Sequence, residues 1–85
     1  MKKPIIGIIA GAGPYAGLDL AAKILEQTNA RNDQDYLPVY SVSTPSKIED
    51  RTRFLLGESA ENPAYALARN FLELQAMKAT VIGLP

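Results

Sequence analysis

The sequence predicts an α/β fold in which a three-layer parallel sheet has helices on both faces. Three stretches are strand candidates: residues 37–43, residues 79–84 and residues 5–9, the last of which is short, continuous, apolar and rich in β-branched residues. That pattern is typical of strands covered on both faces. Helical patterns separate the stretches, and strand–helix–strand units build parallel sheets through right-handed crossovers.

The first strand is followed by a turn and then by a helix. Residues 10–14 read Ala-Gly-Ala-Gly-Pro, and Pro14 suits the first position of a helix. From Tyr15 the apolar residues recur at helical spacing, which predicts that the inward face contains Leu18, Ala21, Ala22 and Leu25. The helix is expected to end near residues 28–29, before a polar surface loop over residues 29–35.

The second strand is expected at an edge of the sheet, because Pro38 at its start lacks a ladder donor. The segment 44–50 is irregular, and residues 51–56 are expected to form a short helix that Asp50 caps and Gly57 ends. Asn62 and Pro63 mark the start of a longer helix. On its expected inward face, residues repeat at spacings of three and four, which leaves Arg69, Asn70 and Glu73 towards solvent; the repeating residues are Ala64, Leu67, Ala68, Phe71, Leu72 and Gln75.

With the second strand at the edge, the predicted spatial order is 2-1-3, as in flavodoxin-like sheets. The carboxyl ends of the first and third strands then flank the point where ligands bind in open α/β sheets. Residues 10–14 should therefore face whatever follows Pro85. We expect residues 1–85 to be the N-terminal fragment of a larger α/β domain, with little chemistry of its own.

Composition narrows the classes of function. Nine basic and nine acidic residues cancel, which argues against nucleic acid or an anionic membrane as partner. The chain has no His and no Cys, so the common zinc sites and the His-dependent nucleophiles are excluded, and no metal is expected. The apolar run at residues 5–10 is shorter than the roughly 7–15 residues of a secretory h-region, so a cytoplasmic protein is the default.

Residues 11–16 match the pattern G-x-G-x-x-[G/A] between a strand and a helix. The backbone N–H groups and the helix dipole would favour an anion there. Three interpretations stay open: a small carboxylate, a dinucleotide, or a structural tight turn. A dinucleotide site should place an acid at the end of the second strand, which here ends in Ser43 and Thr44.

A second candidate site is the segment 44–52, which also follows a strand and so lies along the same edge. The planar fork of Arg51 can donate two parallel hydrogen bonds to a carboxylate. The pattern alone also allows a plainer interpretation, in which Asp50 caps a helix and Arg51 pairs with a surface acid.

Taken together, these stretches resemble the start of an aspartate racemase, of the cofactor-independent Asp/Glu racemase superfamily. The motifs occur in the family's order over nearly the whole chain: residues 6–14, 33–35, 37–39, 49–52, 56–57 and 82–85. The resemblance implies an isomerase without pyridoxal phosphate or another cofactor, and we expect a homodimer. One thiolate removes the α-proton of an amino acid, and a thiol on the opposite side returns a proton.

The resemblance also implies the site residues. In the family, the strand that ends at Pro85 continues into Cys-Asn-Thr, and the second cysteine comes from the other lobe, so no catalytic residue is expected in this chain. The turn Gly11, Ala12, Gly13 and Pro14 should line the substrate pocket, and Arg51 should bind a substrate carboxylate. Thr44 and Lys47 complete the expected substrate-binding set.

The sequence departs from the family pattern at several positions. Ala10 and Ala12 stand where the family has Gly and Met, so the volume near the turn should differ. Lys78 replaces a glycine that ends the second long helix, so it must adopt a left-handed conformation or end the helix differently. The stretch 44–49 is about one residue longer than the family pattern, which leaves the register of Lys47 open.

Two other functions stay open from the sequence. One is a nucleotide-binding Rossmann-like domain, which the glycine pattern favours. The other is a non-catalytic module derived from a racemase lobe, whose unpaired third strand would pair with a second copy.

Overall fold

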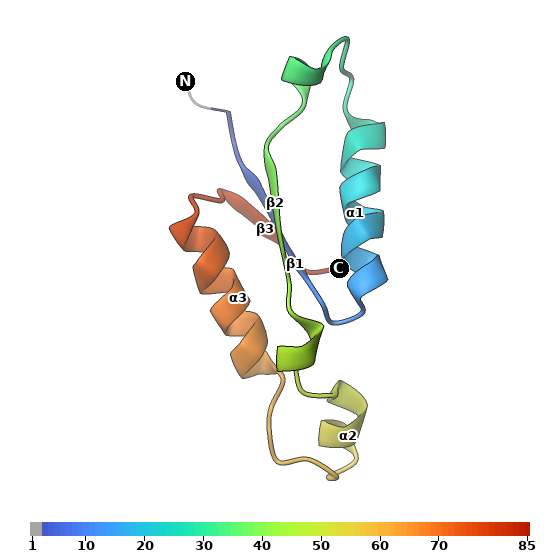
Figure 1. Ribbon diagram of the computed structural model, residues 1–85, viewed down its shortest axis with the longest axis vertical. Helices are drawn as coiled ribbons and strands as arrows, with labels where there is room; N and C mark the ends of the chain where they lie inside the picture. The colour runs from blue at the N-terminus through green and yellow to red at the C-terminus, as the bar shows by residue number, and fades with distance from the viewer. Residues whose placement is uncertain (1–2) are drawn as a thin grey trace.

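The computed structural model describes residues 3–85 and shows a three-stranded sheet between two long helices (Figure 1). Strand β1 (Ile6–Ala10) lies between β2 (Val39–Ser43) and β3 (Val81–Gly83), and both pairings are parallel. The predicted α/β class and the strand order 2-1-3 are therefore confirmed.

The register brings the carboxyl ends of the strands to one edge of the sheet. Ile6 lies opposite Val39 on one side and opposite Val81 on the other, while Gly83 lies opposite Ile8. The strands are slightly shorter or shifted relative to the predicted ranges. Strand β2 begins only after Pro38, whose carbonyl oxygen accepts a hydrogen bond from the Ile6 N–H at 2.9 Å.

Helix α1 (Pro14–Gln27) covers one face of the sheet (Figure 1). It turns a different side inward from the one predicted. Gly17 is buried in the α1–β1 contact, and Leu20, Ala21 and Ile24 are half-buried on the same side. Of the predicted inward set, Leu18 is 68% exposed, and Ala22 and Leu25 are exposed as well. The prediction of this face was therefore wrong except at Ala21.

Helix α3 (Ala64–Ala76) covers the opposite face (Figure 1). Here too the side that meets the sheet differs from the one predicted. Leu74 is fully buried and Asn70 is 2% exposed, whereas Leu72 is 60% exposed. The expectation that Asn70 faces solvent was wrong. Both long helices carry two apolar stripes, and a helical period gives the spacing of each stripe but not which one meets the sheet.

The ends of α3 follow from local hydrogen bonds. The Asn62 side-chain oxygen accepts from the Ala64 N–H at 2.9 Å, as the predicted helix start requires. At the other end Lys78 has φ 72°, so it adopts the left-handed conformation. The Lys78 N–H donates to the Gln75 carbonyl and the Ala79 N–H to the Leu74 carbonyl, which together form a Schellman motif.

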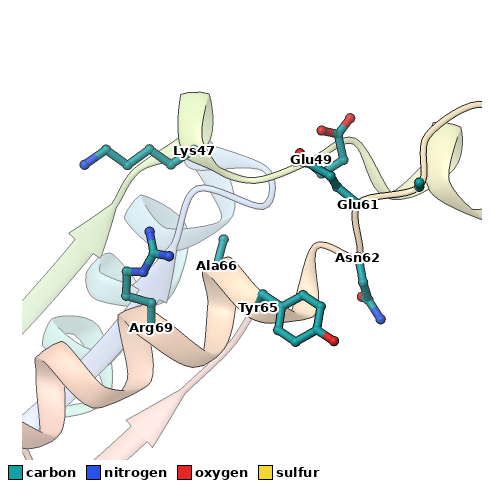
Figure 2. A pocket seen from close by; sticks show the side chains of 8 residues that line it. Lys47, Glu49, Glu61, Asn62, Tyr65, Ala66 and Arg69 are labelled. Carbon is teal, nitrogen blue, oxygen red and sulfur yellow. The ribbon is translucent and has the colours of Figure 1, made fainter.

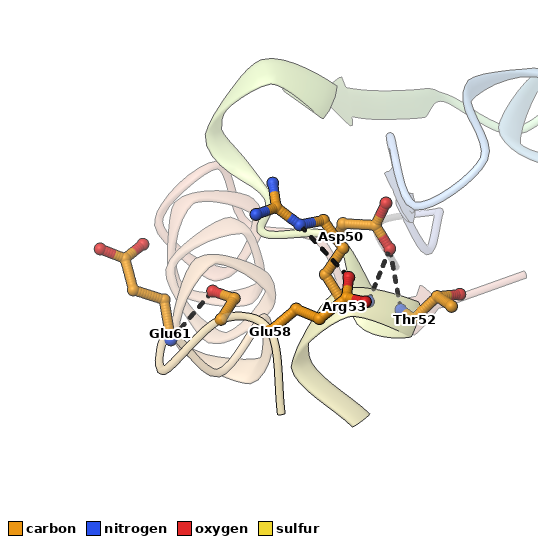
Figure 3. Close-up of polar contacts among 6 residues, drawn as sticks. Asp50, Thr52, Arg53, Glu58 and Glu61 are labelled. Atoms are coloured by element: carbon orange, nitrogen blue, oxygen red, sulfur yellow. Dashed lines mark hydrogen bonds and ion pairs between the residues drawn. The ribbon is translucent and has the colours of Figure 1, made fainter. Parts of the chain in front are cut away.

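Three shorter elements connect the layers. The 3₁₀ turns η1 (Asp33–Asp35) and η2 (Pro45–Lys47) flank β2, and the short helix α2 (Arg51–Leu55) precedes α3. The Asp50 carboxylate caps α2, as predicted, by accepting from the N–H groups of Thr52 at 2.8 Å and Arg53 at 3.2 Å (Figure 3). Within residues 3–85, no helix has the length and apolar character needed to cross a bilayer.

Candidate functional site

The turn between β1 and α1 depends on two glycines. Gly11 has φ 103° and Gly13 has φ 88°, conformations that L-residues with a Cβ rarely adopt. Pro14 then begins α1 at the position where its missing N–H costs nothing. These three residues bring the chain sharply from the end of the central strand into the helix.

Gly11 also lets the loop after β2 approach closely. A Cβ at Gly11 would lie 3.1 Å from the Thr44 backbone nitrogen and 3.2 Å from that of Pro45. It would also lie 3.2 Å from the Ile48 side chain. The turn and the loop therefore pack against each other, and the loop carries Arg51 towards the glycines.

Between them lies a hollow of about 260 Å³, here called the glycine hollow. Its lining residues are Gly11, Ala12, Gly13, Ile48, Glu49, Asp50 and Arg51. It lies at the carboxyl end of β1, beside the positive end of the α1 dipole, where an anion is stabilised.

Arg51 is the charged group of the glycine hollow best placed to bind an anion. It is exposed, and in the part of the chain that the structure describes its guanidinium forms no ion pair. Asp50, by contrast, accepts two backbone hydrogen bonds as the cap of α2. The plainer interpretation of this segment was thus right about Asp50, while residues 3–85 give Arg51 no acidic partner.

The structure divides the predicted substrate-binding set between two places. Gly11, Ala12, Gly13 and Arg51 line the glycine hollow together. Pro14 begins α1 and does not line it. Of the two alanine departures, Ala12 reaches the hollow, whereas Ala10 packs in the core against Gly17.

Thr44 and Lys47 line a second hollow of about 180 Å³, between the loop after β2 and α3. We call it the Asn70 hollow; its lining residues are Thr44, Lys47, Ala66, Arg69, Asn70 and Glu73. A wider hollow of about 470 Å³ shares Lys47, Ala66 and Arg69 with it and extends past Tyr65 (Figure 2).

Sequence reasoning missed Arg69 and Asn70. A signal for Asn70 existed, because it stands three residues after Leu67 and four before Leu74, on the stripe that the structure turns inward. An amide within an apolar stripe is a buried polar group that needs partners.

The groups around the glycine hollow can bind and orient a ligand rather than perform chemistry on it. Its titratable residues are Glu49, Asp50 and Arg51, and the sequence supplies no thiol or imidazole. In the described residues, no group of three or more acidic side chains could hold a metal ion.

Comparison with known proteins extends this picture. No protein-family model matches the chain. Among solved structures it is similar to an aspartate racemase from Picrophilus torridus, with a TM-score of 0.83 and 29% sequence identity. The match covers 96% of this chain and 35% of that enzyme, so the chain spans about a third of its length. The resemblance that the motifs indicated is confirmed at the level of the fold: almost the whole chain is similar to part of an aspartate racemase.

Proposed function

We propose that this chain is the substrate-carboxylate-binding part of a cofactor-independent racemase for an acidic amino acid, aspartate or glutamate. The observation that supports the proposal most is the meeting of Arg51 with the Gly11–Gly13 turn in one hollow. That hollow lies at the carboxyl end of the central strand of a fold similar to an aspartate racemase.

In this proposal the chain contributes binding and orientation. The Arg51 guanidinium donates two hydrogen bonds to one carboxylate of the substrate. The start of α1 adds the favourable end of its dipole. A carboxylate held at this edge presents its α-carbon to groups outside the 85 residues.

The chemistry is a proton exchange at that α-carbon. One cysteine thiolate takes the α-proton and leaves the electron pair delocalised into the carboxylate. A thiol on the opposite face gives a proton back, which inverts the centre with no oxidation or reduction. In this proposal both thiols come from outside the 85 residues, which contain no Cys. We propose that the 85-residue chain alone is inactive.

The test is exchange of the α-proton in D₂O. The full-length gene product should incorporate deuterium into aspartate or glutamate without added cofactor, and its Arg51→Gln variant should lose most of kcat/KM. Loss of a charged hydrogen bond to substrate corresponds to about a 10- to 100-fold decrease. Absence of exchange on both amino acids would reject the assignment.

A second experiment separates this proposal from nucleotide binding. Titration with NAD(H), NADP(H) and FAD should give no saturable signal. Strand β2 ends in Ser43 and offers no acid to hold a ribose, as a dinucleotide site requires.

The proposal also includes a cytoplasmic homodimer of the full-length protein and, separately, self-association of the 85-residue chain when it is studied alone. Strand β3 pairs with β1 on one side, and its other side is an edge of the described sheet, with Val81 59% exposed. Open apolar edges favour pairing with a second copy. Size-exclusion chromatography of the chain at about 100 μM should show a dimer or larger species. This concentration is chosen because a domain of this size has only a marginal core, so association should stabilise it. A monodisperse monomer would contradict it.

A further inference from the structure

The Asn70 hollow contains a buried polar group without a partner. Asn70 is 2% exposed, and its side-chain nitrogen has no hydrogen-bond partner among residues 3–85. The oxygen of the same amide lies 3.4 Å from the Thr44 hydroxyl, a long contact. Buried amide N–H groups almost always have a partner, so an unsatisfied one calls for an explanation.

Two cations line the same hollow. Lys47 comes from the loop after β2 and Arg69 from α3, one residue before Asn70. Figure 2 shows the Arg69 guanidinium rising from α3 towards the segment that carries Lys47. In the described residues neither side chain forms an ion pair, although Glu73 also lines the hollow. The lining therefore carries one more positive than negative charge.

These groups form a set of donors around a small space. The Asn70 amide offers N–H groups, Arg69 a planar fork and Lys47 an ammonium. Asn70 lines the hollow, and the terminal torsion of an asparagine side chain is broad, so a rotation of the amide can reorient its N–H groups. Donors with an excess of positive charge suit an oxyanion, which can accept from all three through charge-assisted hydrogen bonds.

We propose that the Asn70 hollow is a binding site for an oxyanion, the carboxylate or phosphate of a small metabolite. Asn70 and Arg69 hold the anionic oxygens, and Lys47 adds a second charge from the opposite wall. The site is separate from the glycine hollow: it lies against α3, and the two hollows share no lining residue. It does not depend on the function proposed above.

The experiment follows the Asn70 side-chain amide and the Arg69 guanidinium by NMR in ¹⁵N-labelled protein. Succinate and inorganic phosphate are titrated separately, with sodium chloride keeping the ionic strength constant. We expect saturable shifts at both groups with at least one probe. The probe with the lower Kd identifies carboxylate or phosphate as the preferred source of the oxyanion.

Variants make the result specific to this hollow. Arg69→Gln, at an exposed position, should raise the Kd between about 10- and 100-fold, since a charged hydrogen bond is lost. Asn70→Leu fills the same space without donors and should also weaken binding. The matched control is Arg31→Gln, an exposed arginine in the polar loop after α1, which should leave the Kd unchanged.

Three results would overturn the proposal: no shift beyond that given by chloride with either probe, or an unchanged Kd in Arg69→Gln, or an unchanged Kd in Asn70→Leu. Arg51→Gln distinguishes this site from the glycine hollow. It should abolish a carboxylate response at Gly11 and Gly13 and leave the response at Asn70 intact.

Discussion

Replacing Gly17 by alanine should have two opposing effects on the free energy of unfolding, and the structure allows the size of each to be estimated. Gly17 lies in α1, where alanine is favoured over glycine by about 1 kcal/mol. A Cβ at this position would overlap with the Cβ of Ala10 at the end of β1 and lie 3.4 Å from its Cα. The substitution should stabilise the helix itself but overpack its contact with β1.

The overlap should outweigh the helix preference. Overpacking a core costs about 1–3 kcal/mol, and a methyl group against a methyl group has no rotamer by which to escape. The upper part of that range applies, so Gly17→Ala should lower the free energy of unfolding by about 1–2 kcal/mol after the helix gain is subtracted. In a domain of this size each 1 kcal/mol corresponds to about 4–8 °C in Tm.

A double-mutant cycle tests the cause. Ala10→Gly alone should cost about 1–2 kcal/mol, from the lost methyl burial and the flexibility of glycine in a strand. The double variant Ala10→Gly/Gly17→Ala lacks the overlap. Its loss of stability should therefore be smaller than the sum of the two single losses by about 1–3 kcal/mol. Urea unfolding followed by far-UV circular dichroism measures all four proteins. A coupling energy below about 0.5 kcal/mol would refute the argument.

Two further predictions concern the helix ends. Lys78→Gly should raise the free energy of unfolding by about 0.5–1 kcal/mol, because φ 72° is costly for lysine and free for glycine; Ala68→Gly, an exposed position inside the same helix, should lower it by about 1 kcal/mol. If thermal unfolding showed that both substitutions change Tm in the same direction, the helix-end argument would be contradicted. Asp50→Ala should cost about 1 kcal/mol by removing the cap of α2, and Asp50→Asn, which can still accept from Thr52 and Arg53, should cost much less.

The sequence was sufficient for the fold because several local signals agreed. Pro38 indicated the edge strand, Asp50 and Asn62 the helix starts, and the Gly11–Gly13 pair the turn, and each has a short-range physical cause. Such signals depend on neighbours in the chain, so they survive without knowledge of the tertiary contacts. The order 2-1-3 followed from the edge strand and from the handedness of the crossovers.

The candidate site was predictable only in part, because it depends on tertiary contacts between segments that are distant in the sequence. Gly11 and Arg51 could be brought together because both follow parallel strands, whose carboxyl ends share an edge. Lys47 was expected to bind substrate beside Arg51 but lines the other hollow, because the loop after β2 turns through η2 and directs successive residues to different hollows. Asn70 was misplaced because a helical period does not select the stripe that meets the sheet.

The loop after β2 borders both hollows, so its contact with Gly11 should affect them together. Gly11 and Gly13 both have positive φ, and alanine at either position stores about 1–3 kcal/mol of backbone strain. They differ in what a Cβ would meet: at Gly13 nothing lies within 4 Å, whereas at Gly11 it would press on the loop backbone at 3.1–3.2 Å.

Gly13→Ala should therefore lower stability and leave the loop in place, whereas Gly11→Ala should lower stability and also displace residues 44–48 of the loop. The measurement compares ¹⁵N chemical shifts of residues 44–51 in the two variants. Unfolding curves of both variants give the loss of stability that accompanies each substitution. We expect larger shifts across the loop in Gly11→Ala, together with a changed succinate or phosphate Kd at Asn70. If both variants move the loop equally, backbone strain alone shapes the turn, and the close packing of Gly11 on the loop does not position Arg51.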